Sequence, residues 1–99
     1  MVKHIIIWNF KDELSADERE KYSAEIKSGL EGLKGKIDGL VDIKVQTEFL
    51  ESSNGDLMLD STFVDEKALQ GYQVNPEHVK DAEVVRSVVS SRKCVDFKI

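Results

Sequence analysis

The strongest constraint on the fold is the opening run Val2–Phe10, which is apolar along both of its alternating sets of side chains. Ile5 and Ile7 belong to one set, and Ile6 and Trp8 belong to the other. β-Branched and aromatic residues of this kind favour a β-strand. A strand that is apolar on both faces is typical of a position covered on both sides. The sequence therefore predicts that its first strand lies in the middle of a sheet.

The next segment changes to helical periodicity. Ser15 and Glu18 fit a capping box, in which each side chain accepts a hydrogen bond from the other residue's free backbone N–H. An apolar stripe at helical spacing follows: Tyr22, Ile26, Leu30 and Leu33. We expect a helix over about 15–34 that ends at Gly35, with Gly39 closing the loop behind it.

From Leu40 the apolar residues recur at every second position, which indicates half-buried strands. Two such strands are expected, over about 40–49 and 56–64. The dipeptide Asn54-Gly55 between them is a strong turn signal. The sequence therefore predicts a β-hairpin built around this turn.

The last third of the chain predicts a second helix that is broken in two, followed by a strand. Asp65 can cap a short helical segment that stops before Asn75 and Pro76. Asn75 suits the N-cap of the following helix and Pro76 suits its first turn, where no N–H is needed. We expect this helix over about 76–90 and a final strand over about 92–99.

The resulting order is βαββαβ, which predicts one α+β domain of ferredoxin-like type over residues 1–99. Its antiparallel sheet carries the helices on one face. We expect Cys94 and Asp96 on the opposite, uncovered face, with Val95 and Phe97 turned toward the core. A solvated sheet and a sheet covered by a partner both fit a polar open face. The two-sided first strand favours the partner.

Composition excludes several classes of protein. Lys and Arg total 14 against 19 Asp and Glu, so the net charge of −5 argues against nonspecific nucleic-acid binding. No apolar run approaches the roughly 20 residues that span a bilayer, and no signal peptide is recognisable. We therefore expect a cytoplasmic protein that binds neither nucleic acid nor membrane.

The sequence predicts no metal site and no cofactor. Two histidines and one cysteine are present, without the paired spacing that zinc sites use. The single cysteine also excludes an internal disulfide. Glycine-rich nucleotide-binding loops and the nucleophile elbow of hydrolases are missing as well.

The residues that remain for chemistry gather at the predicted helix break: Tyr72, Asn75, Pro76 and His78. A helix N-terminus is electropositive and disfavours imidazolium, so His78 is expected to stay neutral. A neutral imidazole is what a general base requires. The alternative is a surface histidine beside a tyrosine that only packs in the core.

Three stretches resemble the stress-responsive α/β-barrel (Dabb) domain family, a member of the dimeric α/β-barrel superfamily. They are Val2-Lys3-His4-Ile5-Ile6, Tyr72-Gln73-Val74-Asn75-Pro76-Glu77-His78-Val79 and Val95-Asp96-Phe97. The resemblance covers essentially the whole chain. It implies a homodimer in which two sheets pack face to face as a barrel. It also implies a small pocket between helices and sheet in each subunit.

The family includes a plant polyketide cyclase, and the resemblance carries its site residues to this chain. Its catalytic tyrosine and histidine fall on Tyr72 and His78, and a pocket histidine falls on His4. Two further pocket histidines are replaced, by Asn75 and Leu57, so the pocket here is less polar. The resemblance implies that His78 removes a proton next to a carbonyl while Tyr72 binds the oxygen.

Three functions follow from this comparison. The first is a homodimeric, stress-related protein that binds a small, mostly apolar ligand, with no assigned reaction. The second is a cofactor-independent enzyme that uses His78 and Tyr72 for enolisation or aldol-type cyclisation of a carbonyl compound or polyketide-like thioester. The third is a monooxygenase-like enzyme using Trp8, Asn9 and His78. The opposite faces of Trp8 and Asn9 disfavour that arrangement.

Overall fold

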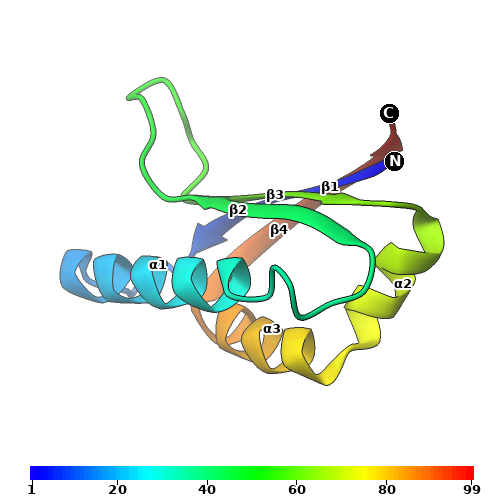
Figure 1. The fold of residues 1–99 in the computed structure, drawn as a ribbon. Helices are drawn as coiled ribbons and strands as arrows, with labels where there is room; N and C mark the ends of the chain where they lie inside the picture. Colours follow the sequence, from blue (N-terminus) through cyan, green and yellow to red (C-terminus); the bar gives the residue numbers. More distant parts are fainter.

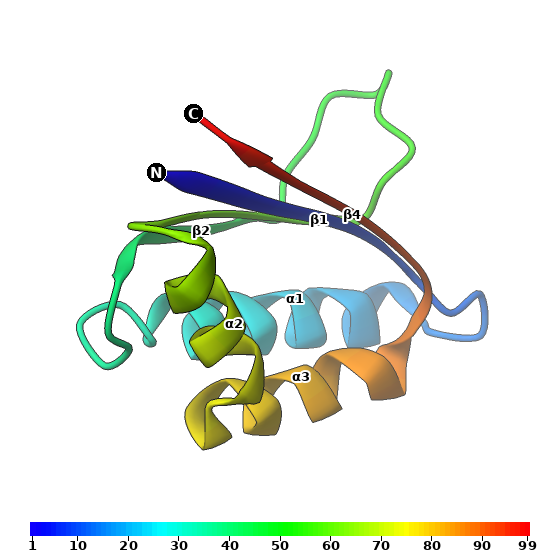
Figure 2. The same ribbon diagram turned by 90° about the vertical axis from the view of Figure 1, so that its right-hand side faces the viewer.

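The opening strand, β1 (Val2–Phe10), lies in the interior of a four-stranded antiparallel sheet with the order β2-β3-β1-β4, as its two-sided apolar pattern predicts. The computed structural model describes residues 1–99. Its other elements are α1 (Ala16–Glu31), β2 (Leu40–Gln46), β3 (Leu57–Phe63), α2 (Glu66–Val74), α3 (Pro76–Val88) and β4 (Val89–Lys98). The ferredoxin-like α+β fold with a divided second helix is confirmed. All three helices cover one face of the sheet (Figures 1 and 2).

The helices begin where their capping residues predict. Ser15 and Glu18 form the expected capping box at the start of α1. The carboxylate of Asp65 accepts a hydrogen bond from Ala68 N at 2.8 Å, which starts α2. The side-chain oxygen of Asn75 accepts one from the backbone of α3 and completes the break.

The predicted end of the first helix was too late. α1 ends at Glu31 with Gly32 as its C-cap, and the chain then passes through turns to β2. Leu33 and Ile37 are nonetheless buried in those turns. Their burial extends the apolar pattern beyond the helix, so periodicity alone overestimated its length.

The expected tight Asn54-Gly55 hairpin turn was wrong, although β2 and β3 do pair antiparallel. A two-residue hairpin turn needs residues with positive φ, and Gly55 does not have one. The loop 47–56 instead rises from the uncovered face of the sheet (Figure 1). Its end is fixed to β1, because the Asp56 carboxylate accepts a hydrogen bond from Phe10 N at 2.8 Å.

The two faces of β4 are the reverse of the expectation. Asp96 lies opposite His4 and Cys94 lies opposite Ile6, and residues directly opposite one another share a sheet face. His4 and Ile6 are buried beneath the helices, so Cys94 and Asp96 belong to the helix-covered side. Alternation within β4 alone predicts the wrong face, because the apolar side chains of an edge strand need not face the core of their own subunit.

The uncovered face therefore carries an apolar stripe across β1 and β4. Val95 pairs with Ile5 and Phe97 pairs with Lys3, and Ile7 follows on the same face. Val95 remains 56% exposed and Phe97 43% exposed. Surfaces of this kind commonly mark a contact with another molecule.

No helix of the chain has the length and apolar character needed to cross a membrane.

Candidate functional site

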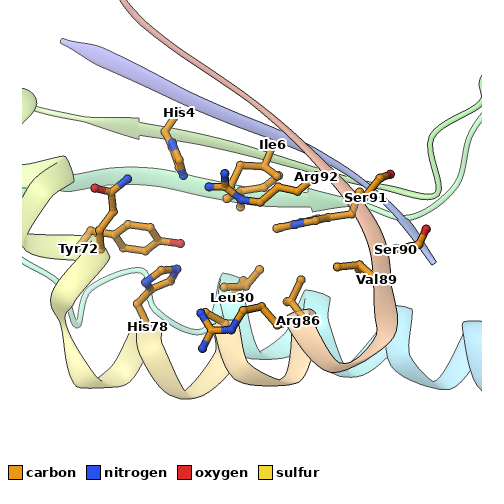
Figure 3. Close-up of a pocket in the computed structure, with 15 residues that line it drawn as sticks. His4, Ile6, Leu30, Tyr72, His78, Arg86, Val89, Ser90, Ser91 and Arg92 are labelled. Atoms are coloured by element: carbon orange, nitrogen blue, oxygen red, sulfur yellow. The ribbon is translucent and has the colours of Figure 1, made fainter. Parts of the chain in front are cut away.

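A cavity of about 590 Å³ lies between the sheet and the helix layer (Figure 3). Side chains from β1, β3 and β4 line it on one side, and side chains from all three helices line it on the other. Much of the wall is apolar, from Ile6, Trp8, Leu30, Leu59, Ala82 and Val85. An apolar cavity with a few polar groups is the usual form of a small-molecule site.

The helix break places two polar aromatic side chains in one wall of this cavity. Tyr72 comes from the last turn of α2 and His78 from the first turn of α3. Their ring centroids lie 4.0 Å apart with an angle of 32° between the planes. His4 approaches from β1, with its ring plane at 68° to that of Tyr72 and a centroid distance of 6.1 Å. The structure thus brings together Tyr72, His78 and His4.

Two polar atoms of this cluster have no hydrogen-bond partner within the chain. They are the hydroxyl oxygen of Tyr72 and Nδ1 of His78, both buried. Tyr72 is fully buried, and Figure 3 shows its hydroxyl directed into the cavity beside the His78 ring. Buried polar groups are normally hydrogen-bonded, so a group without a protein partner calls for an explanation.

Burial also sets the charge states of the pair. Burial, with the Asp81 carboxylate as a smaller contribution, raises the pKa of Tyr72 far above its usual range. Burial lowers the pKa of His78, and nearby His4 adds to this, although the Gln73 backbone and Asp81 oppose it. At neutral pH the site therefore presents a protonated phenol and a neutral imidazole. The neutral His78 agrees with the prediction, but burial is the main cause.

His4 is held in place by Asp96, a residue that sequence analysis assigned to the wrong face. Nδ1 of His4 and a carboxylate oxygen of Asp96 are 2.5 Å apart, and His4 is only 2% exposed. An ionised carboxylate accepts hydrogen bonds and does not donate them, so it favours the proton on Nδ1. The His4 ring projects from β1 toward the cavity (Figure 3).

Cys94 completes a group of three side chains that could hold a metal ion. Its sulfur lies 3.8 Å from Nδ1 of His4 and 3.5 Å from the Asp96 carboxylate. Burial and the neighbouring Asp96 raise the pKa of the Cys94 thiol, so it is protonated. A metal ion would have to displace that proton and the one between His4 and Asp96. Sequence spacing does not reveal the trio, because His4 and Asp96 are 92 positions apart.

A family model described as the stress-responsive A/B barrel domain, Dabb, matches residues 2–99. The chain belongs to the Dabb family. No protein with a curated description matches it significantly.

Solved structures agree with the fold of this Dabb chain. A dimeric ferredoxin-like protein of unknown function from Bacteroides fragilis is 26% identical, with a TM-score of 0.93 over 99% of this chain and 95% of that one. One from Thermobifida fusca, also described as dimeric, is 19% identical with a TM-score of 0.82, covering 99% and 90%. A hydroxynitrile lyase from Passiflora edulis is 16% identical with a TM-score of 0.74, covering 99% and 92%.

Of the other residues suggested by sequence, Leu57, Asn75 and Asn9 lie outside the cavity of this Dabb protein. Leu57 is fully buried in the core, and Asn75 caps α3; neither lines the cavity. Trp8 does line the cavity, whereas Asn9 on the opposite side of β1 donates a hydrogen bond to the backbone of Asn54. Trp8 therefore shares the cavity with His78 but Asn9 does not, so the three residues do not form one site.

Proposed function

We propose that this Dabb protein binds a small, mostly apolar carbonyl compound in the cavity between helices and sheet. The observation that carries the proposal is the pair of partnerless polar atoms, the Tyr72 hydroxyl and His78 Nδ1. Leaving a buried group unpaired costs about 1–3 kcal/mol. A carbonyl oxygen that accepts from Tyr72 removes that cost, and the apolar walls take the rest of the ligand.

The same pair supports a reaction that needs no cofactor. His78 is neutral because burial lowers its pKa, so it can accept a proton from the carbon next to the carbonyl. The C–H electron pair then forms the enolate, and the Tyr72 O–H stabilises the negative charge on its oxygen. The imidazolium returns the proton, either to the same carbon or to the oxygen of a second carbonyl that the enolate attacks.

We also propose that the working unit is a homodimer joined through the uncovered sheet faces. The apolar stripe of Ile5, Ile7, Val95 and Phe97 supplies the contact. Structural relatives from two bacteria are described as dimeric. Each cavity lies on the helix side of its own sheet, so the dimer holds two sites built from one subunit each.

Deuterium exchange tests the reaction directly. Methyl isobutyl ketone and α-ketoisocaproate are incubated with the protein in deuterium oxide, and proton NMR follows loss of the signal next to the carbonyl. We expect the wild-type protein to accelerate exchange in at least one of them. His78→Ala should remove the acceleration and Tyr72→Phe should reduce it about tenfold or more.

Gln70→Ala is the matched control, because Gln70 is exposed on α2 and does not line the cavity. It should leave the exchange rate unchanged. Full exchange in a folded His78→Ala protein would remove His78 from the mechanism. Circular dichroism should show that each variant is folded at the temperature of the exchange measurement.

A further inference from the structure

Two arginines line the same cavity near the Tyr72–His78 pair. Arg86 comes from α3 and Arg92 from β4, so they approach from the helix layer and from the sheet. Figure 3 shows both side chains extending along the cavity toward the end that holds Tyr72 and His78. Both arginines are exposed residues, so the two positive groups line the cavity where it meets solvent, one on the helix wall and one on the sheet wall.

Neither Arg86 nor Arg92 forms an ion pair with a carboxylate of the chain. The protein has 19 acidic residues, and its remaining arginine, Arg19, pairs with Asp56 at 3.6 Å. The two cavity arginines therefore leave positive charge uncompensated in an acidic protein. The two arginines line the same cavity whose apolar walls, Tyr72 hydroxyl and His78 Nδ1 already indicate a ligand.

We infer that the ligand carries an anionic oxygen group, a carboxylate or a phosphate, in addition to its carbonyl, and that Arg86 and Arg92 bind this group. Guanidinium groups bind such anions through paired, charge-assisted hydrogen bonds. The inference rests on the proposed function and specifies its substrate class. With a net charge of −5, the chain repels anions overall, so a local positive pair is needed to admit one.

The arrangement also limits how the ligand is built. The arginines line the same cavity as Tyr72 and His78, so one ligand must hold its anion and its carbonyl within that space. A keto acid with a branched apolar tail fits, because the tail can pack against Trp8, Leu30 and Val85. The positive charge of Arg86 contributes to the lowered pKa of His78. An anion bound there offsets that charge and makes His78 a better base.

Trp8 provides a direct measurement of occupancy. It is the single tryptophan of the chain, it is buried, and it lines the cavity, so its fluorescence reports a ligand there. The probes are α-ketoisocaproate, its methyl ester and isoamyl phosphate, which share a branched apolar tail. The keto acid and its ester differ only in the anionic group.

We expect α-ketoisocaproate to change the fluorescence with a Kd about tenfold or more below that of its methyl ester. Added salt should weaken the binding of the keto acid. Tighter binding of isoamyl phosphate than of the keto acid would support the anion site and assign it to phosphate. The inference is overturned if the ester binds as well as the acid, or if no probe changes the fluorescence at millimolar concentration.

Substitution of the two arginines tests whether they bind the anionic group. Arg86→Gln and Arg92→Gln should each raise the Kd of the keto acid about fivefold to tenfold and leave the Kd of the ester unchanged. Arg92→Lys should recover part of the loss. Lys80→Gln is the control, because it removes the same charge from an exposed position of α3 that does not line the cavity. Unchanged keto-acid binding in both arginine variants overturns the assignment.

The test of the anion site can fail or succeed independently of the test of the proposed reaction. Fluorescence measures binding, whereas deuterium exchange measures proton removal. Arginine-dependent binding of the keto acid without exchange would support the anion site and reject the reaction. Exchange of methyl isobutyl ketone with no preference for the acid would support the reaction and reject the anion site.

Discussion

The imidazole of His78 lies over the phenol ring of Tyr72 at a centroid distance of 4.0 Å, and each ring leaves one buried polar atom without a partner. The contact joins the end of α2 to the start of α3. It depends on the break at Asn75 and Pro76, because a continuous helix would carry His78 past Tyr72 on a single cylinder. The two rings that form the site therefore also carry unpaired buried atoms, which lower the stability of the fold.

Replacing Tyr72 with Phe should stabilise the protein while damaging its function. The change removes a buried hydroxyl that has no partner and keeps the ring packed against Phe63, at a centroid distance of 5.0 Å. We expect the free energy of unfolding to rise by about 1 kcal/mol. Urea denaturation measures it. A loss of stability would show that the hydroxyl is hydrogen-bonded in solution.

The sequence was sufficient for the fold because its local signals agree with one another. Ser15, Asp65 and Asn75 begin the three helices, and the two-sided pattern of Val2–Phe10 places β1 in the sheet interior. The signals failed where a distant contact decides the structure. The loop before β3 is fixed to β1 by two hydrogen bonds, one that the Asp56 carboxylate accepts and one that the Asp56 N–H donates, and its Asn-Gly dipeptide does not reveal them.

The candidate site was only partly predictable for a related reason. Tyr72 and His78 flank a recognisable helix break, so their proximity follows from local sequence. Asp96 reaches His4 only through the register of β1 with β4, and the alternation of β4 pointed to the wrong face. Arg92 reaches the cavity through that same register. Register is a property of the paired strands and cannot be predicted from the sequence of either strand alone.

Stability should fall as the pH drops below about 6.5, because of His78. Its pKa is lowered from 6.5 in the folded protein, mainly by burial, so the unfolded chain binds the proton first. The contribution of neutral His78 is complete above pH 6.5 and is lost as the pH falls toward the folded pKa. His78→Gln should flatten this part of the profile. Urea midpoints at several pH values test it, and an equally steep profile in the variant would contradict it.

Gly39 should tolerate alanine less well than Gly35 does. Both residues have positive φ, at 82° and 86°, which penalises any side chain by about 1–2 kcal/mol. A Cβ at Gly39 would also lie 2.4 Å from the Cβ of Ala68, whereas one at Gly35 would meet nothing within 4 Å. We expect Gly39→Ala to cost at least about 1 kcal/mol more than Gly35→Ala. Equal losses in thermal denaturation would show that α2 moves away at little cost.

Asp96→Ala should destabilise the protein by about 1–3 kcal/mol, because it leaves the buried His4 without its hydrogen-bond partner. Lys98→Ala is the matched control on the same strand. Its ion pair with Glu66 is exposed, with side chains 77% and 64% accessible, and contributes little. Chemical denaturation compares the two. A loss no larger than that of Lys98→Ala would show that water replaces the carboxylate at His4.

Val95→Asp should convert the proposed dimer into a monomer without unfolding it. Val95 is 56% exposed on the uncovered sheet face, opposite Ile5, so the isolated subunit accepts a carboxylate there. In a face-to-face dimer the same group would be buried without a partner, which costs several kcal/mol. Val74→Asp is the control, because Val74 is 76% exposed at the end of α2, away from that face. Light scattering should give a monomer mass for Val95→Asp and a dimer mass for Val74→Asp. A dimer in both would place the interface elsewhere.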